Sequence, residues 1–284
     1  MTETHALTSP TPILARLRKI VRRTRGSHHG PITRLMSPGD LGHVLKPFVF
    51  LDLFDLKVAS SGMGLHPHSG IATVSYLFEG SVCYEDSSGA TGVLLAGGVE
   101  WFKAAPGAWH GGGPGDTGRA RGFQLWLALP PDQELGPVEN VYLEPDAVAR
   151  DGPARVLVGT HGRATSSLNA PASLNYLAVR LRAGESWRYQ PALDHTVGWV
   201  AASRGRVRVP ETVEAGELVI FEPSNHAIDF HAESDTEFVV GSAPPHAHDL
   251  VLGPYSVHTS SATLRAGERR LNEIQHRLQS EGRL

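Results

Sequence analysis

Cysteine is almost absent from this 284-residue sequence, since Cys83 is the only one. A single thiol forms no intramolecular disulfide and cannot build the thiolate clusters that hold structural zinc. An excess of basic residues is also missing, because the formal net charge is −3 at pH 7. Such a chain lacks the positive field that neutralises many phosphates, so we expect no direct nucleic-acid partner.

Long hydrophobic runs are missing as well. No apolar stretch approaches the ~20 residues that a membrane-spanning helix needs, and the N-terminus lacks the apolar block and cleavage site of a secretory signal. We therefore expect a cytoplasmic protein without a membrane partner. Residues 13–25 combine apolar with basic side chains. We interpret them as a packing arm or first strand, with a basic amphipathic helix as the alternative.

Glycine (31 residues) and proline (20 residues) are abundant, whereas charged residues make up only 19% of the chain. This composition favours a turn-rich β protein, and the length suits two domains. From Phe48 to Leu129, short apolar segments alternate with turn signals at the spacing of a β-sandwich or barrel. Among them we expect strands over residues 71–78 and 82–84, separated by a turn at Glu79-Gly80. Residues 122–129 place their apolar side chains on one face at a period of two, which predicts a strand with one buried side.

A second β-rich block follows a connector at residues 130–150 that is rich in proline and acidic residues. Its turn Ala215-Gly216-Glu217 resembles Ala96-Gly97-Gly98 of the first block, which hints at an internal duplication. Near the C-terminus the apolar spacing becomes helical, at Leu271, Ile274 and Leu278. We expect a closing amphipathic helix packed on the barrel surface.

The most informative segment is Gly64-Leu65-His66-Pro67-His68-Ser69-Gly70. Residues i and i+2 of a strand face the same side, so His66 and His68 can point into one cavity. His110, one hairpin later, could complete a facial set of three nitrogen donors. Such sets suit Fe, Mn, Ni, Cu or Zn and leave positions for water, dioxygen or substrate. The alternative is a group of surface histidines in polar loops.

These segments also carry a resemblance to a known family. His66-Pro67-His68-Ser69-Gly70, then residues 73–80, then residues 98–110 are similar in order and spacing to the first cupin domain of pirins. Ala243-Pro244-Pro245 and the glycine-proline pair that opens residues 253–259 resemble the C-terminal signature of that family.

The resemblance implies an all-β fold of two tandem cupin barrels, the double-stranded β-helix or jelly-roll type, with a C-terminal helix. It implies an N-terminal domain over residues 1–135 that carries the metal site. It also implies a metal-free C-terminal domain over residues 136–284, which includes the closing helix.

In pirins, three histidines and one glutamate hold a single Fe-type ion. The resemblance therefore implies His66, His68 and His110 as metal ligands and a divalent transition metal, Fe above others, as the cofactor. The glutamate position two residues after the third histidine is Gly112 here, so we expect a weakened site with uncertain occupancy. Asp116 could supply the missing ligand, although a solvated loop residue is our preferred interpretation.

We expect Trp109 and Gly112 to line the pocket. Some pirins resemble quercetin dioxygenases in activity, where the ligand glutamate is the plausible base toward the flavonol, and a glycine cannot do that work. Flavonol cleavage is therefore less favoured here. The histidines of the second block are interpreted as structural or surface groups: His195, His226 and His231.

Three hypotheses follow. The first is a metal-dependent dioxygenase, quercetin 2,3-dioxygenase-like or another cupin type, that acts on a small organic substrate. The second is a non-catalytic regulatory protein that binds a metal, a ligand or a protein partner. The third is a degenerate, metal-free cupin. Fold alone cannot rank them, because cupin barrels host many chemistries.

Overall fold

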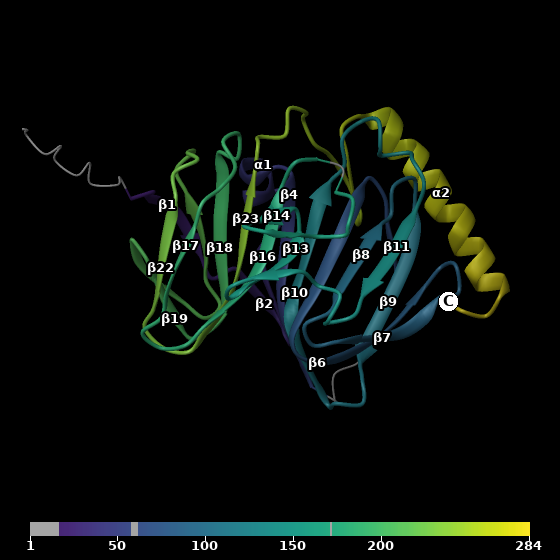
Figure 1. Ribbon diagram of the computed structural model, residues 1–284. Helices are drawn as coiled ribbons and strands as arrows, with labels where there is room; N and C mark the ends of the chain where they lie inside the picture. Colours follow the sequence, from purple (N-terminus) through teal and green to yellow (C-terminus); the bar gives the residue numbers. More distant parts are fainter. Residues whose placement is uncertain (1–16, 58–61, 171) are drawn as a thin grey trace, which may run out of the picture.

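The computed structural model of the chain describes residues 17–57, 62–170 and 172–284. Two β-barrels lie side by side, and a long C-terminal helix covers the outer side of the first barrel (Figure 1). The predicted all-β architecture with a closing helix is confirmed. Among the described residues, neither helix combines the length and apolar character needed to cross a membrane.

The first barrel is built on a sheet with the strand order β11-β8-β6-β10-β4-β3-β2. Strands β5, β7 and β9 form its second face, where β9 pairs with both β5 and β6. The strands are β2 (Ser27–His29), β3 (Ile32–Met36), β4 (Phe48–Lys57), β5 (Met63–His68), β6 (Ile71–Asp86), β7 (Thr91–Leu95), β8 (Val99–Lys103), β9 (Ala108–Pro114), β10 (Arg119–Ala128) and β11 (Glu139–Leu143). A short helix, α1 (Leu41–Leu45), precedes β4.

The second barrel has a sheet of order β1-β21-β18-β23-β16-β13-β12 that faces a smaller sheet of order β17-β22-β19-β20. The strands of the larger sheet are β1 (Ile20–Thr24), β12 (Arg150–Asp151), β13 (Ala154–Val158), β16 (Asn175–Leu181), β18 (Val197–Arg204), β21 (Leu218–Phe221) and β23 (Thr236–Ala243). Those of the smaller sheet are β17 (Ser186–Tyr189), β19 (Arg206–Val209), β20 (Glu211–Glu214) and β22 (Ile228–Ala232). Two further hairpins are β14 (Thr160–His161) with β15 (Ala164–Thr165), and β24 (Val251–Gly253) with β25 (Ser256–His258).

On each side of the expected boundary between residues 135 and 136, one strand pairs with the other barrel. The N-terminal strand β1 pairs with β21 of the second barrel. Within residues 13–25, Ile20–Thr24 therefore form a strand. Residues 13–16 lie outside the described residues. Strand β11 lies inside the acidic connector, yet it pairs with β8 of the first barrel. The expected domain division between residues 135 and 136 stays a prediction.

Strand β6 runs without interruption where the sequence predicted two strands separated by a turn at Glu79-Gly80. Gly80 has a φ of +80°, and a Cβ atom there would lie 1.6 Å from the carbonyl oxygen of Arg119. Glycine therefore bends the strand instead of ending it. As a result, β6 pairs with β8 and β10 in its first half and with β7 and β9 in its second.

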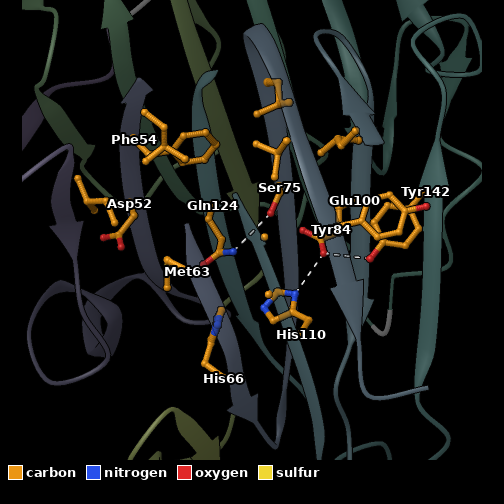
Figure 2. A pocket seen from close by; sticks show the side chains of 17 residues that line it. Asp52, Phe54, Met63, His66, Ser75, Tyr84, Glu100, His110, Gln124 and Tyr142 are labelled. Atoms are coloured by element: carbon orange, nitrogen blue, oxygen red, sulfur yellow. Dashed lines mark hydrogen bonds and ion pairs between the residues drawn. The ribbon is translucent and has the colours of Figure 1, made fainter. Parts of the chain in front are cut away.

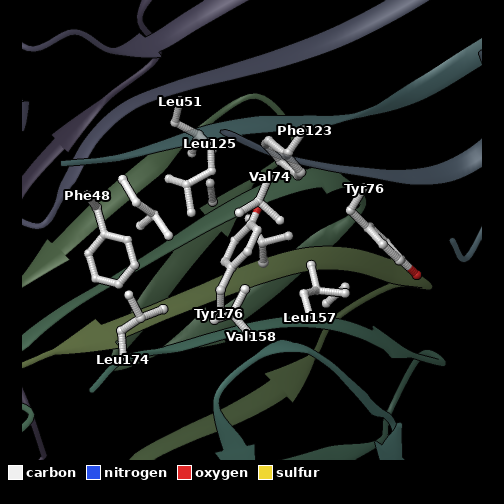
Figure 3. Packing of buried hydrophobic residues seen from close by; sticks show 14 of the residues in the cluster. Phe48, Leu51, Val74, Tyr76, Phe123, Leu125, Leu157, Val158, Leu174 and Tyr176 are labelled. Carbon is white, nitrogen blue, oxygen red and sulfur yellow. The ribbon is translucent and has the colours of Figure 1, made fainter. Parts of the chain in front are cut away.

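The largest apolar cluster lies between the two large sheets and includes residues of both barrels (Figure 3). Val74 and Phe123 of the first barrel belong to the same cluster as Leu157 and Tyr176 of the second. Burial of each large apolar side chain contributes about 1.5–3 kcal/mol. This shared core holds the two barrels together.

The closing helix α2 (Ser261–Ser280) begins at Ser260, whose side chain accepts a hydrogen bond from the backbone N–H of Thr263. Its apolar face packs against Leu65 and Trp109 of the first barrel, through Leu271, Ile274 and Leu278. The helix therefore supports β5 and β9, the two strands that carry the candidate histidines.

Candidate metal centre

The structure brings His66, His68 and His110 together inside the first barrel. Strands β5 and β9 pair so that His66 lies opposite His110. One nitrogen of each ring lies within 4.8 Å of the nitrogens of the other two. The ring centroids are 4.7–5.0 Å apart. His68 and His110 are buried, while His66 is partly exposed.

Each imidazole is held in place through its Nδ1 atom by an oxygen that accepts hydrogen bonds. The acceptors are Gly64 O for His66 (2.9 Å), Tyr255 O for His68 (3.0 Å) and Glu100 Oε1 for His110 (3.1 Å). Carbonyl and carboxylate oxygens only accept, so each Nδ1 donates and each Nε2 keeps a lone pair. All three Nε2 atoms are buried and lack a hydrogen-bond partner among the described residues. Metal-ligating histidines have this arrangement, because the second nitrogen fixes the tautomer and the ring orientation.

Burial also favours the neutral form of two of these rings. It lowers the pKa of His66 to about 4, and the neighbouring His110 ring lowers that pKa further. Burial likewise lowers the pKa of His68 well below its usual value. Metal binding requires neutral imidazole, so these ligands need lose no proton near neutral pH.

Glu100 is a site residue that the sequence reasoning missed. It lies on β8, and its side chain is buried beside His110 (Figure 2). Burial raises the pKa of this carboxyl, but the neighbouring His110 ring and the hydrogen bonds from His110, Ser75 and Tyr142 outweigh that effect and lower the pKa overall. The sequence feature that could have indicated Glu100 is an acidic residue inside the apolar segment Val99–Lys103, which is buried throughout.

Tyr142 also belongs to the site, although it comes from the predicted connector. Its hydroxyl donates a hydrogen bond to Glu100 Oε1 over 3.3 Å (Figure 2). Its ring stacks on Tyr84, with the ring centroids 3.6 Å apart. Strand β11 therefore supplies a second hydroxyl, besides that of Ser75, to the buried carboxylate.

Two cavities meet at the histidines. The inner one has a volume of about 90 Å³ and is bordered by Glu100, His110, Gly112 and mainly apolar side chains. The outer one has a volume of about 400 Å³ and is lined in part by His68, Trp126 and Tyr255. His66 lines both cavities. Each cavity is therefore bordered by two of the three imidazole rings.

The remaining sequence candidates occupy different places. Gly112 lines the inner cavity, and a Cβ atom there would lie 2.7 Å from Cys83 O, so β6 closes this position to a side chain. Trp109, expected at the pocket mouth, lies instead against α2, where its Nε1 donates to Leu271 O over 3.3 Å. Alternation along β9 is the reason, since adjacent residues face opposite sides. Asp116 is exposed to solvent.

The C-terminal segment reaches back to the histidines. Tyr255, whose carbonyl holds His68, has a φ of +57°. The hydroxyl of Ser69 hydrogen-bonds His258 Nε2 over 2.9 Å, and His258 Nδ1 donates to Glu134 over 3.4 Å. All of these last three side chains are buried. This polar network fastens the segment between β24 and α2 to the strand that carries His68.

The histidines of the second barrel are arranged differently. His195 is buried between Ser173 and Ser242, with hydrogen bonds of 3.0 and 2.9 Å to their hydroxyls. His226 is exposed, and His231 is partly exposed. Within the described residues, no second group of His, Cys, Asp or Glu brings three potential ligand atoms as close together.

Comparisons with known proteins agree with the resemblance that the sequence carries. Residues 31–127 match the family model described as Pirin. A pirin-like protein of Caulobacter vibrioides is 29% identical over 247 residues, which cover 83% of this chain and 89% of that protein. Residues 31–127 therefore carry a pirin domain, and the similarity to pirin-like proteins extends over most of the chain.

Solved structures show the same pirin fold. A quercetin 2,3-dioxygenase from Acinetobacter baumannii superposes with a TM-score of 0.84 at 24% identity, over 92% of this chain and 98% of that chain. A bacterial pirin of Escherichia coli, solved in complex with nickel(II), superposes with a TM-score of 0.64 at 22% identity, over 81% of this chain and 99% of that chain. Both likenesses concern the fold.

Proposed function

We propose that the first barrel of this chain binds one divalent transition metal, iron in the cell, through the Nε2 atoms of His66, His68 and His110. One observation carries the proposal: three buried Nε2 atoms converge without hydrogen-bond partners, while every Nδ1 has one. Leaving buried polar atoms unpaired is costly, and a single cation would satisfy all three.

The proposed reaction is the dioxygen-dependent oxidation of a small organic substrate in the cytoplasm. A bound iron-type ion would supply the activation of dioxygen and substrate. The chain's own residues bind and orient: the outer cavity offers an entry path past Trp126 and Tyr255, and the apolar walls of the inner cavity limit water. The solved quercetin 2,3-dioxygenase of the same fold supports this reaction class.

A flavonol is not our preferred substrate. Gly112 lies where the family has its carboxylate, and β6 leaves no room for a side chain there. Glu100 lies behind His110, on the far side of the ring from the converging Nε2 atoms. We therefore propose a substrate that needs no base at position 112.

The same observation at Gly112 favours a second candidate function. Without a carboxylate ligand, the barrel would hold its metal by three neutral donors, and the chain would serve as a metal- or ligand-binding regulatory protein without oxygenase activity. Both functions use the same metal site, but only the dioxygenase would consume oxygen and oxidise a substrate.

Elemental analysis and oxygen uptake test these proposals. We expect about one equivalent of metal in the full chain loaded with Fe²⁺ under anaerobic conditions, by the one-site geometry, and none in the His66→Ala variant. Oxygen consumption with small thiols or other small organic substrates would support the dioxygenase. A loaded protein that consumes no oxygen would favour the regulatory function, and equal metal in both proteins would contradict the site.

A further inference from the structure

A divalent cation held by three neutral imidazoles keeps both of its positive charges. A negative charge nearby would stabilise the bound ion, because an uncompensated charge is costly in surroundings of low polarity. A ligand carboxylate at Gly112 is excluded by the 2.7 Å approach of Cys83 O to a Cβ atom there. A compensating carboxylate therefore has to come from a strand other than β9.

Two carboxylates border the inner cavity. Asp52 is already neutralised, because Arg34 donates two hydrogen bonds to it at 3.0 Å each. Glu100 is different: its partners among the described residues are His110 and the hydroxyls of Ser75 and Tyr142. Glu100 is a buried carboxylate without a lysine or arginine partner in the part of the chain that the structure describes, which is costly unless a cation lies nearby.

The negative charge of Glu100 can act on the metal position through the His110 ring. Glu100 Oε1 lies 3.1 Å from His110 Nδ1, and Nε2 of the same ring faces the other two histidines. Phe102 stacks on the imidazole at 4.3 Å between ring centroids and an interplanar angle of 3°, which fixes the ring plane. A carboxylate bonded to Nδ1 makes Nε2 a stronger donor.

We propose that Glu100 is the charge-compensating and positioning residue of this centre, acting on the metal through His110 in place of a ligand glutamate at position 112. This inference rests on the proposed metal site. It assigns the role to β8, a strand that carries no ligand, and it makes the site complete without a fourth protein donor. Glu100 is a positioning residue because it touches His110 and lies outside the coordination sphere.

Titration of the metal-free full chain with Co²⁺ tests the proposal, with the visible absorption of the bound ion as the signal. Glu100→Gln keeps the shape and the acceptor oxygen but removes the charge. We expect its Kd for Co²⁺ to rise about 10- to 100-fold, the usual cost of losing such a partner. The matched control is Glu237→Gln in the second barrel, which removes a largely buried carboxylate that pairs with Arg121 of the first barrel. This variant should leave the Kd unchanged.

Paramagnetic proton NMR of the Co²⁺ protein gives an independent reading. Three exchangeable Nδ1–H signals are expected, and Glu100→Gln should shift one of them most, that of His110. Circular dichroism checks that the variant is folded. Equal Kd and equal spectra for wild type and Glu100→Gln would overturn this inference alone. A wild type that binds no Co²⁺ would overturn the metal site and the inference together.

Discussion

The two barrels share one scaffold and differ in what fills it. The sheet order β11-β8-β6-β10-β4-β3 of the first repeats as β1-β21-β18-β23-β16-β13 in the second. The turns correspond as well: Ala96 N donates to Gly80 O over 2.9 Å, and Ala215 N donates to Gly205 O over 3.0 Å. The hydrogen-bond pattern supports the internal duplication that the alanine-glycine turns hinted at.

The interiors then diverge at a few positions. Strands β5 and β9 place His66 opposite His110, whereas β17 and β22 place Trp187 opposite Phe230. After the corresponding turns, the first barrel has Glu100 where the second has Val219, a core residue. Polar donors leave a cavity in one barrel, and aromatic rings fill the other. The scaffold sets the positions, and the side chains there set the chemistry.

The largest expected effect concerns the metal. His68→Ala should abolish stoichiometric metal binding, because it removes one of three donors. His195→Ala in the second barrel should keep the metal, although His195 is equally buried, since its ring nitrogens are paired with serine hydroxyls. The measurement is the metal content of the two purified variants, determined by mass spectrometry. Metal lost equally from both variants would break the contrast between the barrels.

The next effect concerns packing. Phe230→Ala should lower the free energy of unfolding by about 3–5 kcal/mol, the usual cost of emptying a well-packed aromatic site. Phe54→Ala should cost less, because Phe54 is partly exposed and borders the existing inner cavity. Denaturant unfolding of the two variants provides the measurement. A larger loss for Phe54 would mean that the first barrel is packed as tightly as the second.

Metal binding should stabilise the folded chain. A metal present at 100 times its Kd adds about 2.7 kcal/mol to the free energy of unfolding, provided that it binds only the folded state. The wild type should therefore melt at a higher temperature with Ni²⁺, whereas His68→Ala should not respond. Calorimetry with and without the ion tests this. An equal shift in both proteins would place the binding outside the three histidines.

The smallest effect is a pH dependence from the second barrel. Burial lowers the pKa of His195, so the unfolded chain takes up its proton first as the pH falls below about 6.5. Stability should therefore decrease with acidification, by at most about 1.4 kcal/mol per pH unit for this one group. His195→Ala should flatten that part of the curve in urea unfolding at pH 5–7. An unchanged slope in the variant would refute the assignment.

The sequence was sufficient for much of the fold. Alternation over residues 122–129 and the helical spacing of Leu271 and Leu278 predicted elements that exist, because local periodicity depends on which face is buried. The predicted turn at Glu79-Gly80 was wrong, because a glycine with positive φ can bend a strand as well as end it. Acidic composition hid β11, whose pairing with β8 is decided by a distant strand.

By itself, the sequence determined a β-rich duplicated fold, a closing helix and three histidines at spacings that suit one cavity. Only the tertiary structure decided that Tyr255 and Glu100 orient two of those rings, that β6 closes position 112, and that Trp109 faces the helix. The physical reason is the distance along the chain over which each effect acts. Periodicity and turn chemistry depend on residues that are close in sequence. The partner of a buried polar atom comes from wherever the fold brings an oxygen within hydrogen-bond distance.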